Sequence, residues 1–269
     1  MNAVIKYPGA KFRIASWIIS QFPEHKTYLE PFFGSGAVFF QKDRSPIETI
    51  NDLDGRVINL FRCIREDPKR LSEMVHWTPY SRSEYDAACI EGEGDDSFEA
   101  ARKFLISCNM GFGRRMTGEK NGFKVDKIGR EKSYAAQDWS TTEDRIFKAA
   151  ERLRGVQIEN RPAIDIIRQY NYEGVLIYAD PPYVLDTRRH SRKQYLHEMS
   201  DEDHIELLTA LNDHKGSVVV SGYDNDLYND MLSGWRKLRT NSLTAANVMA
   251  EETIWMSFEP RYEQMRLAL

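Results

Sequence analysis

The chain has 269 residues, of which 41% are hydrophobic, and carries a formal net charge of −4 at pH 7. This length suffices for one sizeable α/β core with one inserted subdomain. No apolar run approaches membrane-spanning length and no apolar leader follows a basic start, so we predict a soluble cytoplasmic protein. The three cysteines are widely spaced, which argues against a disulfide or zinc framework, and the histidines form no ligand-like pair, so we expect no metal.

A glycine-rich turn is the first feature in chain order that indicates a ligand site. Segment 28–36 has the sequence Tyr-Leu-Glu-Pro-Phe-Phe-Gly-Ser-Gly, which predicts a short strand and a tight loop, followed by a helix over 37–41. Gly34 and Gly36 let the backbone turn sharply and approach a ligand closely, and a helix amino terminus behind them would add partial positive charge. A dinucleotide-binding loop needs a third glycine where this chain has Phe39, which argues against a nucleotide-dependent oxidoreductase.

The next strand is predicted over 47–52, and it ends in an acidic residue. Asp52 could accept hydrogen bonds from both hydroxyls of a ribose. It could instead cap a helix that begins near Asp54, and for Asp52 taken alone we favour this second interpretation.

Residues 59–154 contain several helix signals and almost no strand signal. Three residue pairs are typical of helix starts: Asp67 with Pro68, Ser81 with Glu84, and Ser140 with Glu143. We therefore predict a catalytic domain formed by 1–60 and 150–269, with a helical insertion over 61–149.

Charge is unevenly distributed within this insertion. Acidic residues without basic neighbours occupy 84–99, whereas 102–132 is rich in lysine and arginine, and a second basic cluster lies at 188–193. Solvated surface is the usual role of such runs, but aromatic residues are interleaved here and the clusters adjoin the candidate site, which favours a nucleic-acid-binding face. The residues expected to contact DNA in these regions are Arg114, Arg115, Asn121, Lys124, Arg188 and Arg189.

Strands and helices alternate again after residue 155. We expect strands over 156–159, 175–179 and 217–220, helices over 164–169 and 200–212, and two final strands near 235–243 and 252–258.

The motif Asp180-Pro181-Pro182-Tyr183 ends the apolar run 175–179 and is the most informative in the chain. The run predicts a buried parallel strand whose carboxyl end opens into a loop, where the active sites of open α/β sheets lie. A carboxylate, a main-chain carbonyl and an aromatic ring would lie together there and could receive a flat ring with an exocyclic amine. Taken alone, the motif could also be a turn that merely ends a core strand; the upstream glycine turn favours the functional interpretation.

Four segments in this order resemble the Dam-type adenine-N6 DNA methyltransferases, in particular phage and prophage members. They are Lys-Tyr-Pro-Gly-Ala-Lys at 6–11, Glu-Pro-Phe-Phe-Gly-Ser-Gly at 30–36, Asn-Asp at 51–52 and Asp-Pro-Pro-Tyr at 180–183. The resemblance covers most of the chain, including 221–223 and 252–256. It implies an α/β fold, namely a Rossmann-like S-adenosylmethionine-dependent methyltransferase with a mixed seven-stranded sheet, an antiparallel edge hairpin and an inserted helical target-recognition lobe.

The resemblance also implies the reactants and the residues that bind them. The methyl donor would be S-adenosylmethionine, and the acceptor would be the N6 amine of an adenine flipped out of double-stranded DNA. Catalytic roles are implied for Asp180, Pro181, Pro182 and Tyr183. The residues expected at the donor are Tyr7, Pro8, Gly9, Ala10, Lys11, Glu30, Pro31, Phe32, Gly34, Ser35, Gly36, Asp52, Asn160 and Asp180. Lys11 and Tyr223 are expected to contact DNA as well, and we expect a monomer or weak dimer.

Two departures from the family pattern bear on specificity. Segment 108–115 lacks the aromatic-Asn-Gly-Leu sequence of GATC readers, so relaxed specificity stays open, and Pro162 cannot read the donor's adenine, for which Asn160 is expected to substitute. Cytosine-N4 and protein-glutamine methyltransferases usually have Ser or Asn at the first motif position, so Asp180 favours adenine. A DNA-binding module without activity is disfavoured by the intact Asp180, Gly34 and Asp52.

Overall fold

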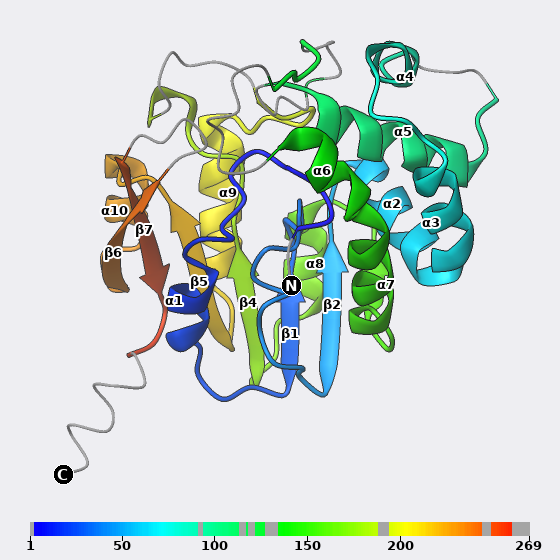
Figure 1. Ribbon diagram of the computed structural model, residues 1–269. Helices are drawn as coiled ribbons and strands as arrows, with labels where there is room; N and C mark the ends of the chain where they lie inside the picture. Colours follow the sequence, from blue (N-terminus) through cyan, green and yellow to red (C-terminus); the bar gives the residue numbers. More distant parts are fainter. Residues whose placement is uncertain are drawn as a thin grey trace.

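A seven-stranded mixed sheet lies at the centre of the structure (Figure 1). Its strand order is β3-β2-β1-β4-β5-β7-β6; β1 to β5 are parallel, and β7 runs antiparallel to both β5 and β6. The strands are β1 (Thr27–Glu30), β2 (Ile47–Asn51), β3 (Gln157–Glu159), β4 (Val175–Ala179), β5 (Ser217–Gly222), β6 (Arg236–Leu243) and β7 (Met249–Met256). The predicted sheet and its antiparallel edge hairpin are confirmed.

This computed structural model describes residues 3–90, 94–112, 117, 122–126, 134–187, 194–243 and 249–259. Its helices are α1 (Ala15–Ser20), α2 (Gly55–Glu66), α3 (Pro68–His76), α4 (Arg82–Ala88), α5 (Ser97–Met110), α6 (Ala135–Ser140), α7 (Thr142–Arg152), α8 (Ala163–Gln169), α9 (Asp201–Asn212) and α10 (Asp226–Met231). Among the described residues, no helix has the length and apolar character that crossing a bilayer requires.

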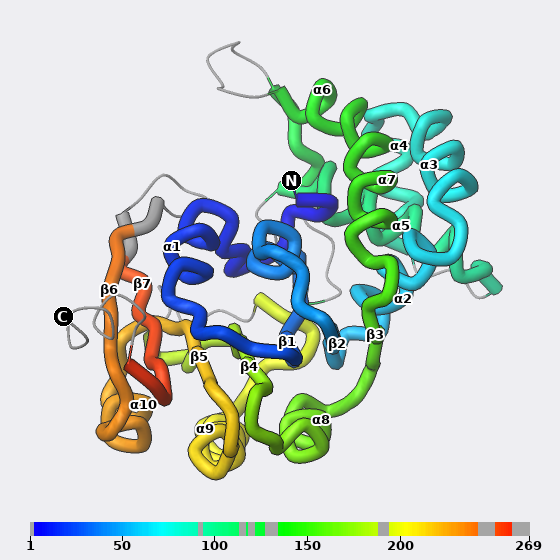
Figure 2. Tube along the Cα trace, turned by 90° about the horizontal axis from the view of Figure 1, so that it is seen from below, coloured from blue at the N-terminus to red at the C-terminus, as the bar shows by residue number. Residues whose placement is uncertain are grey.

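Helices cover both faces of the sheet (Figure 2). On one face lie α8, α9 and α10; α1 lies on the other, and α2 to α7 gather beyond the β2 and β3 edge. The side chains of β4 alternate between the two resulting cores: Val175 and Ile177 pack with α8 and α9, whereas Leu176 and Tyr178 pack on the opposite face. All five β4 residues are buried, which explains why this strand appears in the sequence as an unbroken apolar run.

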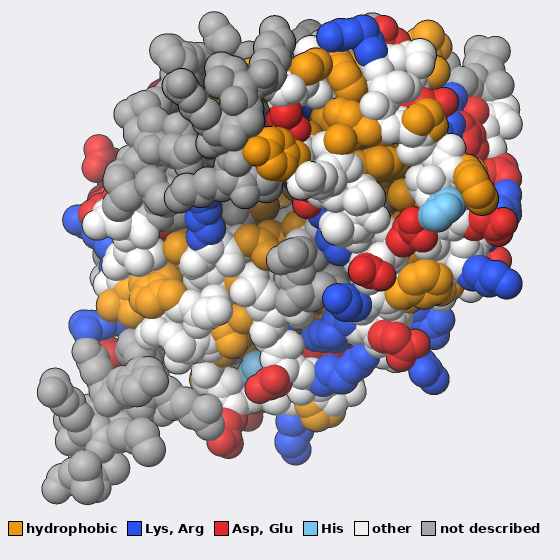
Figure 3. Space-filling model, viewed as in Figure 1, with side chains coloured by type: hydrophobic (Ala, Val, Ile, Leu, Met, Phe, Trp, Pro, Cys, Tyr) orange, Lys and Arg blue, Asp and Glu red, His pale blue; other side chains and the backbone are white. Residues whose placement is uncertain are grey.

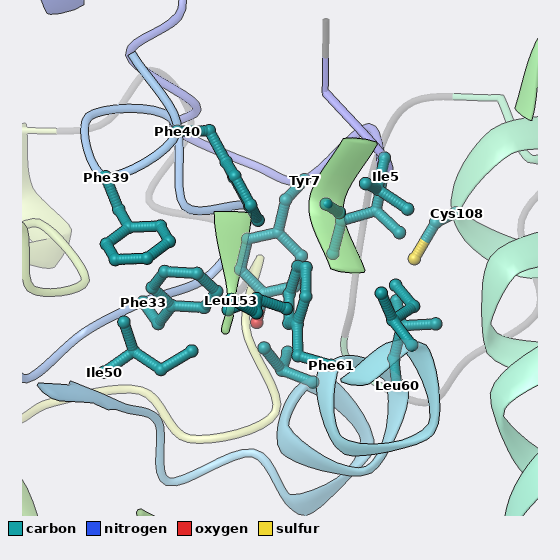
Figure 4. Packing of buried hydrophobic residues seen from close by; sticks show 14 of the residues in the cluster. Ile5, Tyr7, Phe33, Phe39, Phe40, Ile50, Leu60, Phe61, Cys108 and Leu153 are labelled. Atoms are coloured by element: carbon teal, nitrogen blue, oxygen red, sulfur yellow. The ribbon is translucent and has the colours of Figure 1, made fainter. Parts of the chain in front are cut away.

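The helical segment shares its core with the sheet. One continuous hydrophobic cluster contains Ile50 of β2, Phe61 of α2, Cys108 of α5 and Leu153, which follows α7 (Figure 4). Helix α2 runs through the boundary predicted at residues 60 and 61. The elements of the insertion are therefore packed rigidly against the catalytic sheet.

Two of the three predicted helix starts are confirmed. The side chain of Asp67 accepts a hydrogen bond from the backbone of Arg70, and the hydroxyl of Ser81 accepts one from the backbone of Glu84. The start predicted at Ser140 is wrong, because this residue ends α6 and its hydroxyl donates to the carbonyl of Gln137. Its side chain is thereby used within the preceding helix, and α7 begins two residues later without a side-chain cap.

The helix predicted over 37–41 is also absent, and this segment consists of turns. Two hydrogen bonds of helical spacing do form, from the Phe40 and Lys42 backbone N–H groups to residues four positions earlier. At the end of this segment the guanidinium of Arg152 donates a hydrogen bond to the carbonyl of Phe39.

A buried charge cluster fixes this same segment to the sheet and to α7. Glu48 in β2 lies between two cations: Lys42 Nζ is 2.6 Å from its Oε1, and the Arg152 guanidinium contacts both carboxylate oxygens. The side chains of Lys42 and Glu48 are each only 3% exposed. Such a group is stable only while every charge keeps its partner.

We therefore expect Glu48→Gln to reduce the free energy of unfolding by about 3 kcal/mol, because two buried cations would lose their counter-ion. Urea denaturation measures this change. The control is Glu151→Gln, whose side chain is exposed and 3.5 Å from Arg154, and which should alter stability by no more than about 0.5 kcal/mol. Equal losses of unfolding free energy in Glu48→Gln and Glu151→Gln would contradict the stabilising role of the Glu48 charge cluster.

Candidate active site

A cavity opens at the carboxyl ends of β1, β2 and β4. The strand order reverses here, since β2 and β4 flank β1, and ligands of open α/β sheets bind at such switch points. The predicted residues that line the cavity are Tyr7, Pro8, Gly9, Ala10, Lys11, Glu30, Pro31, Phe32, Gly34, Ser35, Asp52, Asp180 and Pro182. Gly36, Asn160, Pro181 and Tyr183 lie outside this lining, as far as the described residues define it.

The glycine turn forms one wall, and its two glycines serve different purposes. Gly34 and Gly36 both have positive φ, 49° and 64°. A Cβ on Gly34 would lie 3.0 Å from the ring of Tyr7, at the cavity wall, so this glycine allows the close approach of chain segments around the ligand space. A Cβ on Gly36 would lie 2.4 Å from the ring of Phe33, inside the aromatic cluster of Figure 4. Gly36 is thus needed for core packing.

Asp52 ties the end of β2 to the glycine turn. Its Oδ2 accepts a hydrogen bond of 2.7 Å from the Gly34 N–H, and its Oδ1 accepts one of 2.9 Å from the Asp54 N–H. Asp54, not Asp52, caps α2, so the capping role favoured for Asp52 is wrong. Burial raises the pKa of Asp52 to about 6. Asn160 lies outside the cavity lining, and its side chain donates a 2.7 Å hydrogen bond to the backbone carbonyl of Asp52.

Asp180 forms a buried ion pair with Lys11. The Lys11 Nζ lies 2.9 Å and 3.0 Å from the two carboxylate oxygens and also donates to the Gly9 carbonyl at 2.7 Å. The Lys11 side chain is only 3% exposed. Burial by itself lowers the pKa of Lys11, but the negative charges of Asp180 and Glu252 outweigh it and raise that pKa above its ordinary value.

A serine completes the orientation of Asp180. The Ser221 hydroxyl, at the end of β5, donates to Asp180 Oδ1 at 2.8 Å and lies 3.0 Å from the hydroxyl of Tyr178. Asp180 is therefore held by a cation from the N-terminal segment and a hydroxyl from a neighbouring strand. Such fixed orientation is what electrostatic preorganisation of an acceptor requires.

A second carboxyl group, that of Glu30, also lines the cavity, and its pKa is raised. Glu30 at the end of β1 is buried and accepts a 2.6 Å hydrogen bond from the Tyr28 hydroxyl. Burial raises its pKa to about 8, and repulsion from Asp180 acts in the same direction. A pKa of about 8 favours the neutral form of Glu30 at pH 7.

Tyr183 lies close to Asp180 in the chain and contacts Glu252, Tyr223 and Lys11. Its hydroxyl donates to Glu252 Oε2 at 2.7 Å, its ring centroid lies 4.6 Å from that of Tyr223, and the Lys11 Nζ lies 4.8 Å from the centroid. The sequence indicated 252–256 as part of a family pattern but assigned Glu252 no role.

Sequence reasoning also missed the segment 194–199, which lines the cavity through Tyr195 to Met199. The ring of Tyr195 lies 6.0 Å from that of Tyr7, and the Glu198 carboxylate accepts hydrogen bonds from the backbone of Gln194 and Tyr195. The only available signal was the proximity of an aromatic residue to a basic cluster.

Most predicted DNA contacts fall outside the described residues, namely Arg114, Arg115, Asn121, Arg188 and Arg189. Lys124 is described: it lies beside the Gly111–Phe123 bridge, and its carbonyl accepts a hydrogen bond from the Tyr80 hydroxyl at 2.8 Å. On the face shown in Figure 3, basic and acidic side chains are intermixed around α7, where no single-sign patch is formed by the described residues.

The sheet order and the acidic motif beside the glycine turn define a Rossmann-like methyltransferase of class I. The family model of the D12 class N6 adenine-specific DNA methyltransferases matches residues 7–249. The chain belongs to this family, and its reaction is methylation of adenine N6 in DNA. The predicted fold class and activity are thereby confirmed.

Individual relatives are consistent with this assignment. The chain is 27% identical over 244 residues to the type II methyltransferase M1.LlaDCHI of Lactococcus lactis subsp. cremoris, covering 84% of each chain. It is 27% identical over 253 residues to the DNA N-6-adenine-methyltransferase of Escherichia phage P1, covering 87% of this chain and 32% of that protein. It is 26% identical over 188 residues to a DNA adenine methylase of Vibrio cholerae serotype O1, covering 68% and 65%.

The protonation state of Glu30 predicts a pH effect on stability. An ordinary glutamate has a pKa near 4.5, whereas that of folded Glu30 is about 8, so between these values the folded state binds one more proton than the unfolded state. The stabilising contribution is complete below pH 4.5 and is lost as the pH rises through 8, by about 1.4 kcal/mol per pH unit.

Glu30→Gln remains neutral and should lack this loss. Urea unfolding of both proteins between pH 5 and 8 is expected to show that stability falls with pH more steeply in the wild type than in the variant. Glu24→Gln, at an exposed position, should retain the wild-type slope. Parallel slopes for the wild type and Glu30→Gln would show that Glu30 is ionised in the folded protein.

Proposed function

We propose that this protein transfers a methyl group from S-adenosylmethionine to the N6 amine of an adenine that has been flipped out of double-stranded DNA, with Asp180 as the main acceptor for the amine. The observation that carries the proposal is the position of Asp180, which is held by Lys11 and Ser221 at the mouth of the cavity. A cellular DNA substrate also supports a cytoplasmic location.

The cavity fits the proposed donor in its shape and chemistry. Gly34 lets the Tyr7 ring pack closely against the cavity wall, a carboxylate at Asp52 follows β2 where a ribose could be held, and apolar side chains such as Phe32 and Ile164 supply surface for a flat ring. Tyr7 to Lys11 border the same space. When bound, S-adenosylmethionine supplies an electrophilic methyl group on a positively charged sulfur.

Asp180 and Pro181 would act on the adenine amine. The N6 lone pair is delocalised into the ring, so the amine is a poor nucleophile until its hydrogens are bound by fixed acceptors. The carboxylate of Asp180 and the carbonyl of Pro181 would each accept one N6 hydrogen, which favours tetrahedral nitrogen and directs its lone pair toward the donor. N6 loses one proton in the reaction, and in this proposal the Asp180 carboxylate, which binds that hydrogen, accepts it.

Stacking would offset part of the cost of extruding the base. Flipping costs a few kcal/mol, and stacking on an aromatic ring returns roughly 1–3 kcal/mol. Tyr183 is the candidate for this role because it lies two residues after the second acceptor, Pro181, with Tyr223 at its side. The helical insertion over 61–149 and the basic segments around Arg114 and Arg188 are proposed to bind the duplex; target strictness would be set there.

The first test removes the acceptor. Asp180→Ala should reduce methylation by several orders of magnitude, because the proposed contact is to the amine; it also leaves the buried Lys11 ammonium without this partner, so donor affinity is measured alongside to separate loss of the acceptor from loss of the cavity. Methyl transfer to unmodified DNA is measured with labelled donor, and the modified adenines are mapped by single-molecule sequencing. Asp230→Ala, exposed on α10, is the matched control and should retain full activity. Near-normal turnover by Asp180→Ala would rule out this role.

The second test removes the proposed ribose contact. Asp52→Ala should weaken donor binding at least roughly tenfold, since it deletes a hydrogen-bonded carboxylate and frees the Gly34 N–H. Isothermal titration calorimetry with S-adenosylmethionine measures this change. Asp43→Ala, at an exposed position before β2, should bind the donor as the wild type does. Unchanged affinity in Asp52→Ala would refute the ribose assignment.

A further inference from the structure

A carboxylate on the edge hairpin reaches across to the tyrosine of the acidic motif. Glu252 Oε2 accepts a 2.7 Å hydrogen bond from the Tyr183 hydroxyl, although the two residues are 69 positions apart in the chain. Glu252 lies in β7, where the next residue, Thr253, pairs with Gly222 of β5. The bond therefore joins the loop after β4 to β7, which lies between β5 and the edge strand β6.

This bond restrains the Tyr183 ring at the end farthest from the backbone. The ring meets Tyr223 edge to face, at an interplanar angle of 70°, and has the Lys11 ammonium 4.8 Å from its centroid. Both contacts act on the ring itself and permit it to tilt, whereas a hydrogen bond at the hydroxyl fixes the tip. A ring used for stacking has to keep one orientation for the base to reach its acceptors.

Glu252 is suited to this restraint because it lies close to the centre without lining the cavity described above. Burial raises its pKa, and the nearby Lys11 charge opposes this effect. Its negative charge in turn contributes to the raised pKa of Lys11. The carboxylate thus has two separable properties, a hydrogen bond to Tyr183 and a charge felt by Lys11.

From this geometry we propose that Glu252 is a positioning residue, which holds the Tyr183 ring at the angle in which it receives the extruded base. This inference rests on the function proposed above. Glu252 acts through the Tyr183 hydroxyl, so its effect is confined to DNA-dependent steps and leaves donor binding unchanged.

A double-mutant cycle tests this dependence. Tyr183→Phe removes only the hydroxyl, and Glu252→Ala removes only its partner, so each should reduce kcat/KM for DNA roughly tenfold, with the KM for donor unchanged. The double variant should lose no more than either single variant, because the same bond is broken in all three. Multiplied losses, near a hundredfold, would show that Glu252 acts independently of Tyr183 and would overturn the proposal.

Two further variants separate positioning from charge and from folding. Glu252→Gln keeps an acceptor for the hydroxyl and should stay within about threefold of wild-type kcat/KM. Glu251→Ala changes the neighbouring exposed carboxylate, which lies 3.5 Å from Arg239, and should leave the kinetics unchanged. A Glu252→Gln variant as impaired as Glu252→Ala would assign the effect to charge. A lowered Tm with normal kinetics in Glu252→Ala would assign it to stability; either result overturns the proposal.

A readout that needs no catalysis distinguishes this inference from the proposed function. In protein carrying ¹³C-labelled tyrosine rings, the Tyr183 resonance is assigned by its absence in Tyr183→Phe. It should shift in Glu252→Ala and stay in place in Glu251→Ala; an unmoved resonance in Glu252→Ala would disprove the restraint. If the wild type methylates no adenine, the proposed function is wrong, whatever the Tyr183 resonance shows. If the wild type methylates adenine but the losses of kcat/KM in the two single variants multiply in the double variant, only the role of Glu252 is wrong.

Discussion

The ion pair between Lys11 and Asp180 is the interaction on which the site depends. Lys11 is almost fully buried, and a buried ammonium without a partner would cost several kcal/mol. Because the same ammonium also binds the Gly9 carbonyl, the pair fixes the N-terminal segment to the end of β4. That segment carries Tyr7, which in turn covers Gly34. One charge pair thereby assembles three walls of the cavity from residues at opposite parts of the chain.

The glycine turn has two roles, because some of its residues pack in the hydrophobic core and others line the cavity. Three aromatic side chains, Phe33, Phe39 and Phe40, turn into the core around Gly36, and Arg152 takes the carbonyl of Phe39 (Figure 4). Residues 37–41 form turns, so the partial positive charge of a helix amino terminus at this segment is not available to a ligand. The donor space is instead bordered by a carboxylate, Asp52, and a bare backbone at Gly34.

Sequence patterns predicted those features that local chemistry determines. The apolar run 175–179 predicted a strand buried on both faces, and the parallel sheet then placed Asp180 near the glycine turn, because parallel strands end at one edge. Contacts between residues far apart in the sequence were not predicted by any such pattern. Lys11 is 169 positions from Asp180, and Arg152 is 113 positions from Phe39. Charged and aromatic residues occur throughout the chain, so neither pair could be selected before the fold was known.

The two carboxyl groups that line the same cavity, Glu30 and Asp180, have different surroundings. Glu30 is buried beside a tyrosine hydroxyl and has its pKa raised to about 8, while Asp180 is matched by an ammonium and a serine hydroxyl. If both were ionised, their repulsion would favour a proton on one of them, and the proton is held more easily where burial is complete. A neutral Glu30 places no second negative charge beside the Lys11–Asp180 pair. In the function proposed above Asp180 accepts a hydrogen of the adenine amine, and the neutral form of Glu30 spares that acceptor the repulsion of a neighbouring negative charge.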